Sequence, residues 1–236
     1  MYNIFQGKRG GVFMRKNDFC LLSISLADNV QKNHQAFLNA FPFGDIELIR
    51  LKNIKNNTSR NNSISSLLCL RDTLISLGVD VEAENLTIER EAGGKPYFAS
   101  FPLYFNITHS QNVCAVAVSD LPVGIDLEFI DVSRDVQSIS KRFFSASEHS
   151  ILCNATDPYD YFFSVWTKKE ARAKFSGKGL AAVWSDQNLD RSDVIFKNYR
   201  LTFEQRTAWL SICTKNKNIN VQINNRCTDF SIRETL

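Results

Sequence analysis

The stretch "VGIDLE", Val123–Glu128, continues into Phe129 and alternates apolar with small or acidic residues. This period of two predicts a strand with one buried apolar face, and it places Asp126 and Glu128 side by side on the opposite face. Two ionised carboxylates that close repel each other, so they favour a nearby cation. A solvated strand face is one interpretation. The other is a Mg²⁺ site, since Mg²⁺ is commonly held by one or two carboxylates together with substrate phosphates.

The bulk composition is that of a soluble globular protein. The chain has 236 residues, 44% of them hydrophobic and 22% charged, which suits one large domain or two small ones. A formal net charge of +3 does not indicate a dedicated nucleic-acid binder, although it permits attraction to an acidic partner. We find no apolar run of membrane-spanning length and no secretory signal of the expected form. The six scattered cysteines form no C-x-x-C pair and predict reduced core thiols in a cytoplasmic protein.

Hydrophobic periodicity outlines an α+β chain. Strands are predicted over Phe19–Leu26, Asp45–Leu51, Leu103–Thr108, Val113–Val118, Val123–Phe129, Ala208–Thr214 and Ile219–Ile223. Helices are predicted over Asn33–Phe41, Ile64–Leu77, Ser133–Phe143, Ser147–Ala155 and Tyr161–Phe175, with an Asn-rich loop over Lys52–Ser63. The order of elements recurs after the midpoint, and residues 112–120 faintly resemble residues 207–215, as in a duplicated unit. We therefore divide the chain into an N-terminal extension (1–18), an N-terminal α+β half (19–122) and a C-terminal α+β half (123–236).

The segment "FFSVWTKKEARAKFSGKGL", Phe162–Leu180, carries an i, i+4 row of chemically distinct side chains. On a helix, Phe162 and Trp166 precede Glu170 and Lys174 along one face. One interpretation is a helix pinned by its aromatic residues, with a surface ion pair that contributes roughly 0.3–0.5 kcal/mol. The other places Glu170 on a metal and Lys174 on a phosphate.

Two further motifs have both a structural and a functional interpretation. "YFNITHS", Tyr104–Ser110, is a strand that ends in hydroxyl and imidazole groups, which can close the strand or bind a phosphate. In "RFFSASEHS", Arg142–Ser150, Ser145 followed by Glu148 matches the capping-box pattern, and we favour that structural role.

Taken together, these motifs and their order resemble the 4′-phosphopantetheinyl transferases of the Sfp type, which include the bacterial holo-acyl-carrier-protein synthases. That family shows G-K-P, F-N-[IL]-[ST]-H-S, G-[IC]-D-[ILV]-E, F-[ST]-x-x-E and W-[TS]-x-K-E-A-x-x-K in this order. The matching segments here are Gly94–Pro96, Phe105–Ser110, Gly124–Glu128, Phe144–Glu148 and Trp166–Lys174. The resemblance is specific over about Gly94–Leu180, whereas the N-terminal third and the last fifty or so residues match only in general pattern.

The resemblance implies a fold of two pseudo-symmetric α+β halves with the active site in the cleft between them. It implies transfer of the phosphopantetheine arm of coenzyme A to a serine of an apo acyl or peptidyl carrier protein, in fatty acid or secondary metabolite biosynthesis. It further implies that Mg²⁺ is held by Asp126, Glu128 and Glu170, and that Lys174 contacts the pyrophosphate. The nucleotide end would be bound by Lys95, Thr108, His109 and Arg60. The catalytic residues would be Asp126, Glu170 and Lys174, with Glu170 a candidate base, directly or through a metal-bound water.

The sequence also departs from the family. The region before the first long helix, "NNTSRNNSISSLL", holds Arg60 among asparagines where many relatives are rich in arginine, Ser66 replaces a small glycine, and Thr108 replaces the usual serine. These changes bear on nucleotide affinity more than on chemistry. The alternatives are therefore a non-catalytic coenzyme A or nucleotide-binding relative and, from composition, a nucleic-acid-associated protein. For the transferase we expect a monomer that binds neither nucleic acid nor membranes.

Overall fold

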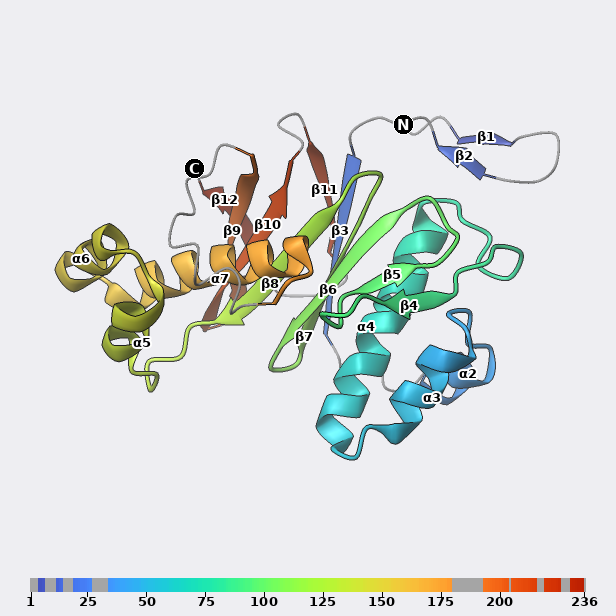
Figure 1. The fold of residues 1–236 in the computed structure, drawn as a ribbon, viewed down its shortest axis with the longest axis horizontal. Coiled ribbons are helices and arrows are strands. Elements are labelled where there is room, and N and C mark those ends of the chain that lie inside the picture. Colours follow the sequence, from blue (N-terminus) through green and yellow to red (C-terminus); the bar gives the residue numbers. More distant parts are fainter. Residues whose placement is uncertain are drawn as a thin grey trace. The chain divides into compact units, whose positions relative to one another are not determined.

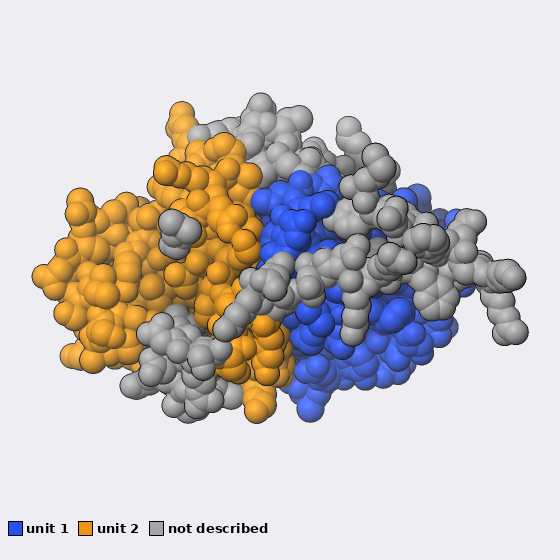
Figure 2. Space-filling view, turned by 90° about the horizontal axis from the view of Figure 1, so that it is seen from above, with its two compact units in different colours: residues 1–122, 218–227 blue, residues 123–217, 228–236 orange. Residues whose placement is uncertain are grey.

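The computed structural model describes residues 4–6, 12–14, 19–26, 34–179, 193–203, 205–215, 219–225 and 230–235. The chain forms two compact units, which Figure 2 colours separately: unit 1 comprises residues 1–122 and 218–227, and unit 2 comprises residues 123–217 and 228–236. Residues 218–227, assigned from the sequence to the C-terminal half, cluster with unit 1 because strand β11 (Asn220–Asn225) pairs with β3 (Phe19–Leu26). Both units combine helices with sheets, so the α+β class is confirmed.

Unit 1 is built on a four-stranded sheet in the order β11-β3-β7-β6. The predicted consecutive strands β6 (Tyr104–Ser110) and β7 (Val113–Ser119) are antiparallel neighbours, and β11 runs parallel to β3. The long helix α4 (Asn57–Ser76) packs on this sheet (Figure 1). Smaller elements complete the unit: the helix α2 (His34–Asn39), the pair β4 (Ile88–Arg90) and β5 (Pro96–Phe98), and the hairpin β1 (Ile4–Gln6) and β2 (Val12–Met14).

Two sequence predictions in unit 1 are wrong. The segment Asp45–Asn53 forms helix α3 and not a strand, because Glu47 and Leu51 share a buried helical face four residues apart. Acidic residues in its first turn and basic residues in its last also suit a helix dipole. The predicted Asn-rich loop becomes helix from Asn57 onward, since the Asn56 side chain accepts a hydrogen bond from the Ser59 backbone and caps α4.

Unit 2 repeats the plan of a four-stranded sheet under one long helix. The sheet has the order β12-β9-β10-β8, all antiparallel. Its strands are β8 (Val123–Phe129), β9 (Ile195–Phe203), β10 (Arg206–Thr214) and β12 (Phe230–Thr235); β9 and β12 were not predicted. The helices are α5 (Val136–Phe143), α6 (Ala146–Asn154) and α7 (Pro158–Ser176), close to the predicted ranges. Leu180 and Cys227, which the sequence interpretation used, lie outside the described residues.

Helix α7 lies directly against β8, and Gly124 makes this approach possible. A Cβ atom added at Gly124 would collide with the Ala171 carbonyl oxygen and the Phe175 backbone nitrogen, and would lie 2.7 Å from the Phe175 Cα. The face of β8 that carries Asp126 is therefore covered by α7. Of the two interpretations of this face, the solvated one is wrong, because α7 and the neighbouring strand bury nearly every residue of β8.

Three further contacts fix α7 along the sheet. At its first turn, the Asp160 carboxylate accepts hydrogen bonds from Arg200 Nε at 3.0 Å and Trp209 Nε1 at 3.1 Å. Midway along the helix, the buried Thr167 and Ser211 hydroxyls lie 2.8 Å apart. These contacts, together with the close approach of α7 to β8 at Gly124, determine which α7 side chains face β8.

We predict that Gly124→Ala lowers the free energy of unfolding by at least about 3 kcal/mol, because the new methyl group meets helix backbone that cannot turn aside. Urea denaturation measures this loss. Gly179→Ala is the matched control in the same unit: nothing lies within 4 Å of its added Cβ, and its φ of +76° alone should cost about 1–2 kcal/mol. Equal losses of unfolding free energy in the two variants would contradict the close approach of α7 to β8.

Candidate active site

The aromatic end of the predicted α7 row is a packed core. The Phe162 and Trp166 rings stack with their centroids 5.6 Å apart, and Phe144 stacks on the other side of Phe162 at 5.2 Å. Phe162 is fully buried. This packing confirms that Phe162 and Trp166 share one face of α7. It also holds α7 against the rest of unit 2, so that Glu170 and Lys174 project from a fixed helix.

The polar end of the row meets the carboxylate face of β8. Lys174 Nζ donates a hydrogen bond to Asp126 Oδ1 at 2.7 Å, and the Asp126 side chain is only 6% exposed. Lys174 therefore pairs with a carboxylate on β8, a contact that the interpretation of a surface Glu170–Lys174 pair did not include. The ammonium group of Lys174 thus places one positive charge beside Asp126.

Glu170 lies in a negative environment. Burial, reinforced by the charge of Asp126 and to a smaller extent that of Glu128, raises the pKa of Glu170 from 4.5 to about 7; Lys174 and Arg134 oppose this shift. The effect requires the three predicted carboxylates to lie near one another in unit 2. A carboxyl group with a pKa near neutrality can take up or release a proton under ordinary conditions.

The described residues contain no cluster of three or more His, Cys, Asp or Glu side chains already arranged to hold a metal ion. The chemistry of the donor set nevertheless suits a hard cation, because all three groups are carboxylates. One of them, Asp126, already contacts a cationic group.

The neighbouring motif residues have a structural role. Ser145 and Glu148 form the predicted capping box at the start of α6. Glu148 also pairs with the buried Lys169 at 3.0 Å, and Lys169 lies over the Phe144 ring. The residue before Glu170 therefore ties α7 to α6, which restrains the backbone that carries Glu170.

Unit 1 contains a separate cavity of about 210 Å³ that includes predicted residue His109. Its walls come from α3, α4, β4, β5 and β6, and they are lined by Glu47, Arg50, Ser63, Ser66, Leu67, Arg90, Pro96, Ile107 and His109. Two guanidinium groups, an imidazole and two hydroxyls make this cavity suited to an anion.

The two arginines of this cavity are positioned by one buried carboxylate. Glu47, 2% exposed, accepts hydrogen bonds from Arg50 NH2 at 2.7 Å and Arg90 NH2 at 2.8 Å. Burial alone would raise the pKa of Glu47, but the hydrogen bonds and charges of Arg50 and Arg90 outweigh it and hold that pKa below its usual value. Arg90 also donates from NH1 to the Gly94 carbonyl at 2.8 Å, which ties it to the Gly-Lys-Pro turn.

The other predicted nucleotide-binding residues are not among those that line this cavity. Thr108 is 2% exposed and, by strand alternation, faces the opposite side of β6 from His109. Arg60 lies on α4 and donates to the Asn57 side chain at 2.9 Å. Lys95 precedes β5 in the turn, where its carbonyl accepts from the Glu91 backbone.

Sequence reasoning missed Glu47, Arg50 and Arg90. The first two were placed on a strand, where a spacing of three residues puts side chains on opposite faces. On a helix the same spacing makes them neighbours. The signal was present in the acidic start and basic end of the segment Asp45–Asn53.

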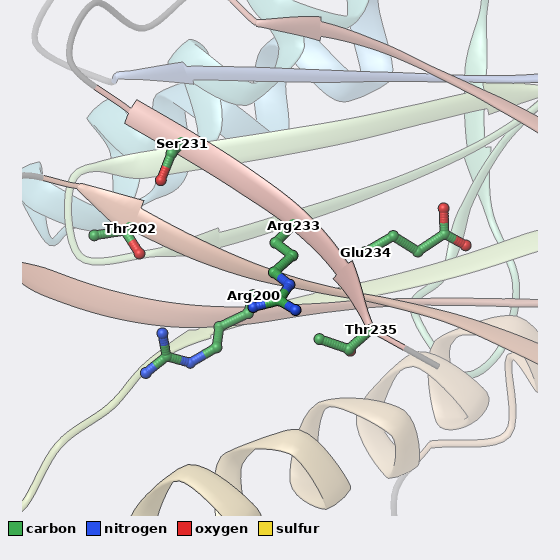
Figure 3. A pocket seen from close by; sticks show the side chains of 6 residues that line it. All are labelled: Arg200, Thr202, Ser231, Arg233, Glu234 and Thr235. Carbon is green, nitrogen blue, oxygen red and sulfur yellow. The ribbon is translucent and has the colours of Figure 1, made fainter.

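A second groove, in unit 2, lies along β9 and β12 and has a volume of about 480 Å³ (Figure 3). It is lined by Arg200, Thr202, Ser231, Arg233, Glu234 and Thr235. None of the residues predicted from the motifs lines it. Its Arg200 holds Asp160 at the start of α7, which gives this edge of the groove a structural task.

Comparison with known proteins gives the family. Residues 122–224 match the 4′-phosphopantetheinyl transferase superfamily. The transferase gsp of Aneurinibacillus migulanus is 33% identical over 178 residues, which is 73% of this chain and 68% of gsp. HetI of Nostoc sp. is 39% identical over 108 residues (43% of this chain, 46% of HetI). The transferase psf-1 of Bacillus pumilus is 40% identical over 101 residues (42% of each chain).

The chain belongs to the 4′-phosphopantetheinyl transferase superfamily, as the motifs indicated. It spans less than half the length of HetI and psf-1 and about two thirds of gsp. None of the helices in the described ranges has the length and apolar content that a membrane span requires.

We predict that Glu170→Gln reduces the loss of stability that the metal-free protein suffers as the pH rises. The pKa of Glu170 is about 7 in the folded protein and near 4.5 in the unfolded chain, so ionisation destabilises the native state progressively between these values. At about pH 8 the variant should be more stable than the wild type by about 1–2 kcal/mol after screening, with little gain at about pH 4. Urea unfolding in the presence of a metal chelator measures the stability at both pH values.

The exposed residue Glu82 provides the control for this measurement. Glu82→Gln should leave the pH profile of stability unchanged. A Glu170→Gln profile parallel to that of the wild type would contradict the negative environment assigned to Glu170.

Proposed function

We propose that this protein transfers the 4′-phosphopantetheine arm of coenzyme A to a serine of an apo acyl or peptidyl carrier protein, with Mg²⁺. The observation that carries the proposal is the group of carboxylates in unit 2. Asp126 lies 2.7 Å from Lys174, and Asp126 and Glu128 both raise the pKa of Glu170. Family membership supports the same reaction class.

In the proposed reaction, the serine oxygen attacks the phosphorus that bears the pantetheine arm. The bond from that phosphorus to the bridging oxygen breaks, and 3′,5′-adenosine bisphosphate leaves. The serine proton would pass to Glu170, directly or through a water, because a carboxylate within one water of the hydroxyl can serve as base. Lys174 would exchange its contact with Asp126 for one with the pyrophosphate and so supply positive charge as the leaving group departs.

Asp126, Glu128 and Glu170 would hold the Mg²⁺. The cation would neutralise charge on the pyrophosphate oxygens when bound. Substrate oxygens complete the coordination of such sites. Glu170 must lose its proton before it can serve as a ligand.

We propose that the cavity of unit 1 binds the phosphate-bearing nucleotide end of coenzyme A. Arg50 and Arg90 replace the arginine-rich stretch whose absence was noted in the sequence, and His109 lines the same cavity. The hydrogen bonds from Arg50 to Glu47 use Nε and NH2, which leaves NH1 as a donor for a phosphate oxygen. Lys95, Thr108 and Arg60 stay sequence predictions for nucleotide binding.

We also propose a monomeric protein in the cytoplasm. The five described cysteines are all free thiols, and four of them are buried. The acidic partner would be a carrier protein, whose charge complements the net charge of +3.

The decisive experiment incubates the protein with several apo carrier proteins, coenzyme A and Mg²⁺, and measures the intact mass of each carrier. We expect a phosphopantetheine adduct, and we expect Asp126→Ala to lower the rate by about 100-fold or more because Lys174 and the metal lose their shared carboxylate. Glu234→Ala, at an exposed carboxylate on β12, should transfer at the wild-type rate. Tight coenzyme A binding with no adduct on any carrier would instead support the non-catalytic relative.

We predict that Arg50→Ala and Arg90→Ala each weaken coenzyme A binding about 10- to 100-fold, because a charge-assisted hydrogen bond to phosphate is lost. Dephospho-coenzyme A, which lacks the 3′-phosphate, should bind the variants and the wild type within about 3-fold. Calorimetry gives both affinities. Arg71→Ala is the matched control, since Arg71 pairs with Asp72 outside the cavity. An equal loss of affinity for both ligands would show that the 3′-phosphate does not bind in this cavity.

A further inference from the structure

Helices α5 and α6 bring a thiol, an imidazole and a hydroxyl together, away from the carboxylates of β8 and α7. Cys153 Sγ lies 3.6 Å from His149 Nε2, and the other ring nitrogen, Nδ1, lies 2.9 Å from Ser140 Oγ. His149 and Cys153 are four residues apart and therefore share one face of α6. The proposed transfer reaction uses none of these groups.

The hydrogen bonds of Ser140 favour one arrangement of neutral His149. The Ser140 hydroxyl donates to the Gln137 carbonyl at 3.0 Å and lies 2.9 Å from His149 Nδ1. With its hydrogen on that carbonyl, its oxygen accepts from His149 Nδ1–H, and the Nε2 lone pair then faces the Cys153 sulfur. This tautomer is the one in which the imidazole can take a proton from the sulfur.

The surroundings of Cys153 are also those of an accessible thiol. Cys153 is the one exposed cysteine among those in the described part of the chain, where Cys20, Cys69, Cys114 and Cys213 are buried. Burial, with a smaller contribution from Asp120, raises the pKa of Cys20 to about 12, so that thiol resists ionisation. The Cys153 thiol also donates a hydrogen bond to the Gln137 side-chain oxygen at 3.3 Å, so its proton must leave that acceptor before it reaches His149.

We propose that Cys153 is a modification site, at which His149 acts as base and Ser140 positions the imidazole, and that it reacts with low-molecular-mass disulfides. The Cys153 proton moves to His149 Nε2, and the thiolate attacks one sulfur of the disulfide. A new S–S bond forms on Cys153 and the original S–S bond breaks. The departing thiolate takes the proton from His149, so one disulfide is exchanged for another and no further oxidant is needed.

The test uses the full chain and oxidised glutathione, with the adduct followed by intact mass and located by peptide mapping. In the wild type we expect one fast adduct, on Cys153. Cys153→Ser should abolish that adduct, and His149→Gln should slow it about 10-fold or more because the base is lost. Cys227→Ser, which removes the cysteine outside the described residues, should leave the fast adduct unchanged.

Two measurements remain decisive even if a variant folds poorly. In the wild type, Cys153 should react faster than the same cysteine in the urea-unfolded chain, because only the folded chain presents the imidazole. Nitrogen NMR of His149 should show the Nδ1–H tautomer, and Ser140→Ala should lose this preference along with the fast rate. A wild-type rate in His149→Gln, a native rate no faster than the unfolded one, a first adduct on another cysteine, or an Nε2–H tautomer would overturn the proposal.

Discussion

The carboxylate site of unit 2 depends on how closely the backbone of α7 approaches β8. Gly124 lacks the atom that would hold the helix away, and the approach covers the strand face that carries Asp126. Asp160 and Thr167 then fix the helix along the sheet. With both its distance and its register set, α7 delivers Lys174 to Asp126. The chemistry of this face therefore follows from a backbone contact and not from the acidic residues alone.

Each unit contains a largely buried carboxylate. The charges around each carboxylate determine whether it is ionised or keeps its proton. Glu47 is buried between two guanidinium groups, so it stays ionised and orients them. Glu170 is also largely buried, but two carboxylates lie near it and one ammonium is already committed to Asp126. Its proton is consequently held up to neutral pH. The same side-chain chemistry thus serves as a fixed support in one unit and as an exchangeable group in the other.

The sequence predicted the parts of the fold in which pattern and packing agree. The three consecutive strands in the middle of the chain and helix α7 are found as predicted, because their alternation or helical spacing coincides with burial. The capping box at Ser145 and Glu148 is a local hydrogen-bond pattern, and it is also confirmed. The three carboxylates that the motifs singled out, Asp126, Glu128 and Glu170, lie near one another in unit 2, and their role as metal ligands stays a prediction.

What could not be predicted depends on contacts between distant segments. The segment Asp45–Asn53 alternates apolar and polar residues like a strand. It forms a helix because Glu47 becomes buried in contact with Arg90, 43 residues away. The burial of both faces of β8 depends on a helix that follows it by dozens of residues, which local periodicity does not reveal. The pairing of the Cys153 thiol with His149 is local in sequence, but the state of the imidazole depends on Ser140 from a different helix.

Strand β11 places a late part of the chain at the edge of the first sheet. It pairs in parallel with β3, from Asn220 opposite Phe19 to Asn225 opposite Ile24, and the following strand, β12, returns to the sheet of unit 2. On the ribosome, β3 and β7 emerge long before the strand that completes their sheet. The nascent chain must therefore carry an open β3 edge until residues 220–225 have emerged, and completion of unit 1 waits for that strand.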